Sequence, residues 1–120
     1  MKAVSPECQA LLIKSMQSTL SKLENACTKM NENGSSTTLA KQRRDAVKIA
    51  LDRLENAWHG TDFSYEAEDI LEARNVLIGI LPSVEKQYEK VKDGSPQKTL
   101  LERRIASIEA AIEALGAHTQ

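Results

Sequence analysis

The sequence has few of the residues that carry enzyme chemistry or crosslinks. Its 120 residues include two cysteines, two histidines, one tryptophan, two tyrosines and one phenylalanine. Glycine-rich phosphate loops, a serine nucleophile elbow and paired-cysteine zinc motifs are all absent from it. The common sequence signatures of nucleotide, acyl-transfer and zinc chemistry are therefore missing, and we expect neither a cofactor nor a metal site.

Neither sign of charge dominates the chain. Sixteen basic and 17 acidic residues leave a formal net charge of -1. The densest basic run, residues 41–44, is followed at once by Asp45. Without a basic excess there is no long-range attraction for phosphates, so we expect no nucleic-acid partner and no anionic membrane surface as a partner.

Long apolar runs are also absent. The longest candidate, residues 76–81, is far shorter than the roughly 20 residues that span a bilayer, and no apolar signal core precedes the first helical segment. Cys8 and Cys27 fall on one predicted helix about 28 Å apart, at about 1.5 Å per residue, and cannot pair with each other. We expect buried free thiols and a cytoplasmic protein.

What the sequence does contain is helical periodicity. In the first such segment apolar residues recur in alternating steps of three and four, as at Ile13, Met16, Leu20 and Leu23. This spacing is typical of a helix with one apolar seam. Start signals and turn-forming residues separate four segments of this kind, which predict helices over residues 6–30, 38–59, 65–93 and 96–115.

Individual residues set these boundaries. Ser5 and Ser95 each precede a proline, the arrangement in which the serine caps a helix and the proline takes its first position. We expect Ser64 to cap the third helix, and Gly60 and Gly116 to end the second and fourth. The apolar phase of the third segment continues through Pro82, so we predict one helix kinked there rather than two helices.

The fold class that follows is all-α, an antiparallel up-down four-helix bundle forming a single domain over residues 1–120. Short connections between long helices favour antiparallel neighbours. Seam spacing near 3.5 residues favours shallow crossings. The alternative is a pair of extended helical hairpins that complete their core by dimerising.

Several residues are not explained by the seams. Leu11, Val76 and Leu100 point away from them, and Ile78 widens the apolar stripe of the third helix. Such a helix is either central in the core or part of an interface with another protein or a second copy. Arg74 holds a seam position, as does Arg44 in the second helix, and each should reach outward or pair, helping to set helix register or partner choice. These five residues, with Arg44 set aside, are our candidates for a partner-facing surface: Leu11, Arg74, Val76, Ile78 and Leu100.

Carboxylate pairs offer a second, chemical hypothesis. Asp69 and Glu72 lie three residues apart on one helix face, as a magnesium-bridging pair would require. Glu55 and His59 form only one helix-borne pair, whereas di-metal bundles use two Glu-x-x-His motifs. We therefore expect a small cytoplasmic protein that acts through protein–protein contacts, as an adaptor, regulator or immunity-type binder that can form a homodimer. The alternative is a magnesium-dependent nucleotide phosphohydrolase.

Overall fold

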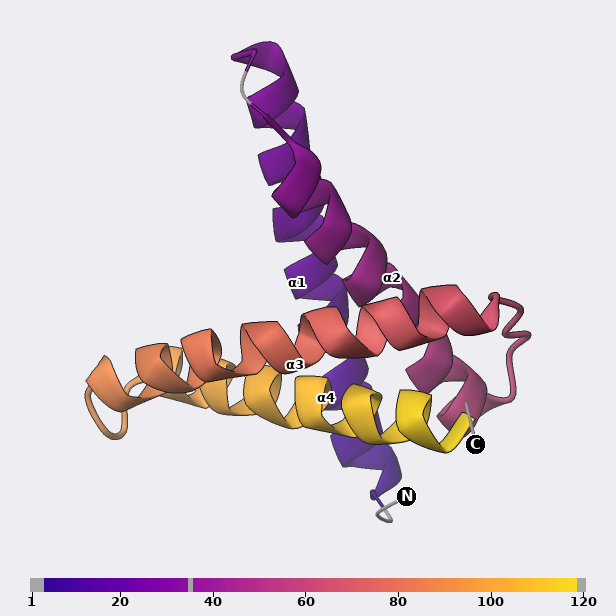
Figure 1. Ribbon diagram of the computed structural model, residues 1–120. Coiled ribbons are helices and arrows are strands. Elements are labelled where there is room, and N and C mark those ends of the chain that lie inside the picture. The colour runs from indigo at the N-terminus through magenta and orange to yellow at the C-terminus, as the bar shows by residue number, and fades with distance from the viewer. Residues whose placement is uncertain (1–3, 35, 119–120) are drawn as a thin grey trace.

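The computed structural model describes residues 4–34 and 36–118, and these form four helices with no strand among them. The helices are α1 (Pro6–Glu32), α2 (Thr38–His59), α3 (Ala67–Lys90) and α4 (Pro96–His118). Consecutive helices run antiparallel, α1 with α2 and α3 with α4, as Figure 1 shows. The predicted all-α four-helix bundle is confirmed.

The expected start signals work as the sequence indicates. The Ser5 hydroxyl accepts a hydrogen bond from the Cys8 amide at 3.3 Å, and Pro6 is the first residue of α1. The second helix ends at His59, where Gly60 takes a left-handed conformation (φ 72°) and its amide bonds the Asn56 carbonyl. A residue with a Cβ is strained in that conformation, which is why glycine suits this end.

In the first and third helices, three ends differ from the prediction. The first helix continues to Glu32, beyond residue 30, until Asn33 and Gly34 turn the chain. The third spans 67–90 rather than 65–93, and its N-cap is Glu66 instead of Ser64. The Tyr65 side chain just before it is held by Asp52 of α2, so this residue belongs to the loop. The ends were mispredicted because tertiary contacts decide them as much as capping preference does.

The fourth helix passes through Gly116 and ends at His118, so the prediction that this glycine terminates it is wrong. A Cβ added at Gly116 would lie 3.0 Å from Nε of Arg74. The glycine therefore lets an arginine of α3 lie close against α4, and its role is close approach rather than helix termination.

The third helix continues through Pro82, as predicted. Proline has no amide hydrogen, so the carbonyl four residues earlier, at Ile78, loses its usual helical donor. Ile78, Gly79 and Pro82 are all exposed, and water can reach the freed carbonyl. One helix with a proline inside it therefore spans the molecule.

The two hairpins do not lie side by side. In Figure 1 the α1–α2 hairpin crosses the α3–α4 hairpin steeply, and both project beyond the crossing. The molecule is correspondingly flat, 41 × 40 × 21 Å. Helix α2 packs against both α3 and α4, and α1 packs against α4, whereas within the described residues the backbones of α1 and α3 approach each other less closely. The shallow crossings predicted from the seams thus describe the pairs within each hairpin only.

The core lies where the hairpins cross. Met16, Leu54, Leu77 and Leu115, one from each helix, have no exposed surface. Small side chains fill the space between them. Five alanines expose no more than 2% of their surface: Ala46, Ala50, Ala73, Ala111 and Ala114. Because a small side chain allows two helices to approach closely, these alanines suit a steep and close crossing.

Candidate functional site

The predicted partner-facing residues fall into two groups. Leu11, Ile78 and Leu100 are exposed by 40%, 43% and 59%. Val76 is partly buried and packs against the core. Arg74 is also partly buried, and its Nε donates to the Ile112 carbonyl at 3.1 Å. Three of the five side chains are thus exposed, while two are engaged within the chain.

A second arginine makes a similar bond. Nε of Arg53 donates to the Ala114 carbonyl at 3.0 Å, and its Nη1 donates to the side chain of Asn56 at 2.6 Å. Burial lowers the pKa of the Arg53 guanidinium. Together with Arg74 it joins α2 and α3 to the last turns of α4, where carbonyls favour positive charge. The other seam arginine, Arg44, pairs instead with Asp45 at 3.0 Å, one of the two expected outcomes.

The outer face of α3 carries apolar side chains that the sequence analysis used only in part. Leu71, exposed by 53%, lies seven residues before Ile78, so the two stand on the same face of the helix, two turns apart. Leu39, exposed by 57%, is an exposed apolar residue on a different helix, at the start of α2. The seven-residue spacing of Leu71 and Ile78 was the available signal; Ile78 was singled out from the sequence, but Leu71 was not.

The crossing of the hairpins creates corners, and one of them is acidic. Asp45 of α2 and Asp69 and Glu72 of α3 line it together with Val76. We call these three carboxylates the acidic corner. The structure thus brings the predicted Asp69 and Glu72 pair beside a third carboxylate. In the described part of the chain, however, no three histidine, cysteine or acidic side chains are placed to hold a metal ion.

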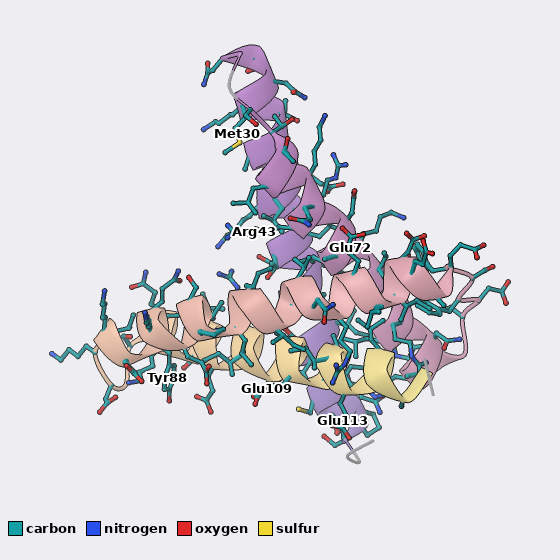
Figure 2. All side chains as sticks on the ribbon, in the orientation of Figure 1. Met30, Arg43, Glu72, Tyr88, Glu109 and Glu113 are labelled. Carbon is teal, nitrogen blue, oxygen red and sulfur yellow. The ribbon has the colours of Figure 1, made fainter. Side chains whose placement is uncertain are left out.

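A second corner, on the other side of the α1–α2 hairpin, is basic. Lys22 of α1, Arg43 of α2 and Arg104 of α4 line it, and no acidic residue does. We call these three cations the basic corner. Figure 2 shows Arg43 and Glu72 on opposite sides of the α1–α2 hairpin. Sequence reasoning missed this site because its three cations come from three helices and form no local motif.

The aromatic residues near the α2–α3 loop close one end of the molecule. Trp58, Phe63 and Tyr65 are partly buried and pack against the core. The Tyr65 hydroxyl donates a short hydrogen bond to Asp52, and Phe63 lies 5.1 Å from the Tyr65 ring. Burial, helped by this neighbouring carboxylate, raises the pKa of Tyr65 to about 12. These contacts tie the loop to α2 and give it a structural role.

The cysteines are both free, but only Cys27 is buried; Cys8 is exposed, contrary to the expectation that both thiols are buried. Cys8 lies in the first turn of α1. Among the described residues no helix is long and apolar enough to cross a membrane.

Comparison with known proteins gives no match: no family model, no curated protein and no solved structure is significantly similar to this chain. The site must therefore be interpreted from its own geometry.

Proposed function

We propose that this chain acts through protein–protein contacts, as a small cytoplasmic adaptor, regulator or immunity-type binder, and that it can pair with a second copy of itself. The observation that carries this proposal is its unusually large surface. The accessible area is 7519 Å², whereas a folded monomer of 13.3 kDa exposes about 6,450 Å². The excess, roughly 1,000 Å², resembles the 800 Å² or so that each partner buries in a standard interface.

The character of that surface supports the same function. Large apolar side chains stand exposed on every helix, and Leu71 and Ile78 form a short apolar row on the outer face of α3. Gly79 beside them leaves open space where a Cβ would stand. A face with apolar residues and no bulky neighbour lets another helix approach closely. We take this face of α3 as the contact surface.

The test is the molar mass in solution, measured by light scattering across a range of protein concentrations. A dimer has twice the 13.3 kDa of the monomer. We expect Ile78→Asp to shift the protein towards the monomer with unchanged helicity, because Ile78 is 43% exposed and its loss opens no cavity.

Two variants serve as controls. Leu39→Asp changes an even more exposed apolar residue, on α2, and should leave the dimer intact. Val76→Asp changes a residue packed against the core and should lower helicity. A monomer at every concentration would contradict self-association. Photo-crosslinking from position 78 but not from exposed position 29, near the end of α1, would then support a different protein partner, and crosslinks from neither position would contradict the proposal altogether.

The acidic corner is the only observation favouring the phosphohydrolase alternative. It brings Asp69 and Glu72 near Asp45, but these do not form a group suited to a metal ion. We therefore develop the first proposal.

A further inference from the structure

The three cations of the basic corner line a pocket, and residues from all four helices form its walls. Its volume is about 210 Å³, and its lining includes Leu23, Val47 and Leu77 beside the cations Lys22 and Arg43. Val47 and Leu77 belong to the core, with 1% and 0% of their surface exposed. The pocket therefore has an apolar floor that continues into the core and a cationic rim.

The third cation, Arg104, is left without a partner in this pocket. Its Nε is buried and makes no hydrogen bond within the described residues. No carboxylate of those residues pairs with Lys22, Arg43 or Arg104, although Arg44 and Lys48 next along α2 both have acidic neighbours. A buried donor without an acceptor costs free energy, so its presence indicates an acceptor supplied from outside the chain.

The volume of the pocket limits the size of the apolar group that can carry this acceptor. A cavity of about 150 Å³ lined by apolar side chains binds benzene, which has six carbons. In proportion, 210 Å³ holds an apolar body of about eight carbons. A guanidinium presents its N–H groups in a planar fork that matches a carboxylate.

We infer that the basic corner binds a small amphipathic carboxylate, an apolar body of about eight carbons bearing one negative charge. The apolar body lies against the partly exposed side chains of Leu23 and Ile80, which belong to the same lining as the buried Val47 and Leu77. The carboxylate accepts hydrogen bonds from Arg104, with Arg43 and Lys22 adding positive charge. This site is separate from the outer face of α3, since Leu71 and Ile78 do not line the pocket. It therefore stands or fails independently of the proposed protein contacts.

The experiment is a titration of the full chain with octanoate, followed by backbone amide chemical shifts. We expect a dissociation constant in the millimolar range or tighter, as befits a ligand of this size, with the largest shifts at lining residues such as Ser83 and Gln87. Octanamide has the same apolar body without the charge, and inorganic phosphate has the charge without the body. Both should bind at least about tenfold more weakly.

Matched variants assign the binding to the corner. Arg104→Gln should weaken octanoate binding at least about tenfold, whereas Arg103→Gln, the same change one residue away and outside the pocket, should leave it unchanged. Arg43 is exposed, so Arg43→Gln should weaken binding severalfold without affecting the fold, and this variant keeps the test valid if Arg104→Gln unfolds.

Three results would overturn the inference. They are octanamide or phosphate binding as tightly as octanoate, equal binding by the Arg103 and Arg104 variants, and the absence of any shift at the corner in tens of millimolar octanoate.

Discussion

The centre of the molecule and its projecting ends follow the same sequence pattern but reach different degrees of burial. Met16 and Met30 occupy one seam of α1, yet Met16 is fully buried and Met30 is 36% exposed. At the crossing, side chains of two hairpins surround each seam residue. Towards the tips only the partner helix of the same hairpin covers it. Burial here depends on how many helices meet at a position, and the seam alone does not indicate that number.

The largest expected effect is the difference in unfolding free energy between a substitution at the crossing and one away from it. Leu54 at the crossing is fully buried, and Leu54→Ala should lower the free energy of unfolding by about 3 to 5 kcal/mol because it leaves a cavity. Leu100 is 59% exposed, and Leu100→Ala should change it by less than about 0.5 kcal/mol. Urea unfolding followed by circular dichroism measures both. Similar losses for the two variants would show that the crossing is not the centre of stability.

Much of this architecture could be predicted from periodicity. Four helices, their antiparallel order and three of their starts follow from apolar spacing and from serine-proline and glycine signals. The steep crossing could not, because the seams contain large apolar residues and the crossing depends on alanines such as Ala50 and Ala111. An alanine in a helix has the same pattern whether it is buried or exposed, and only the second hairpin decides which.

The candidate sites were predictable to a smaller extent. Ile78 and Leu100 were found because large apolar residues outside a seam are visible in the sequence. The basic corner was not, because Lys22, Arg43 and Arg104 meet only when two hairpins cross. Arg74 was recognised as unusual, but its bond to the Ile112 carbonyl involves a backbone acceptor, which no side-chain pattern reveals.

An effect of intermediate size compares two polar contacts, the Tyr65–Asp52 hydrogen bond and the Lys98–Asp93 ion pair. Tyr65 donates to Asp52 in a partly buried site near the crossing, and Tyr65→Phe should cost about 1 to 2 kcal/mol. At the tip of the α3–α4 hairpin, Lys98 bonds Asp93 at 2.6 Å, and Asp93 is 94% exposed. Lys98→Met should cost less, because water screens the exposed Asp93 carboxylate and methionine keeps the apolar part of the Lys98 side chain. Thermal unfolding at neutral pH measures both, and the reverse order would contradict the comparison.

The pH dependence of the stability contributed by the Tyr65–Asp52 hydrogen bond is also predictable. The pKa of Tyr65 is raised to about 12 from an ordinary value of 10.0, so the folded protein favours the neutral phenol. The stability it contributes is fully present below pH 10 and is lost as the pH rises from 10 towards 12. Tyr65→Phe should remove this part of the alkaline loss of melting temperature. An unchanged alkaline profile in this variant would mean that other groups cause it.

The smallest expected effect is the change in stability when either of two glycines within helices, Gly79 or Gly116, is replaced by alanine. At Gly79 a Cβ meets open space, so Gly79→Ala should stabilise α3 by about 0.5 to 1 kcal/mol, or a few degrees in melting temperature. At Gly116 the same change brings a Cβ to 3.0 Å from Nε of Arg74. Displacing that side chain weakens its bond to α4, so Gly116→Ala should gain less or lose stability. Equal gains would show that Arg74 moves aside freely.

The crossing of two stiff hairpins has a mechanical consequence. The acidic and basic corners lie on opposite sides of the α1–α2 hairpin, above the same helix α3 (Figure 2). Any rocking of one hairpin over the other, about the alanines between them, would narrow one corner and widen the other. A molecule wedged into the basic corner would resist this rocking, so the acidic corner, which it never touches, would be held at a fixed width.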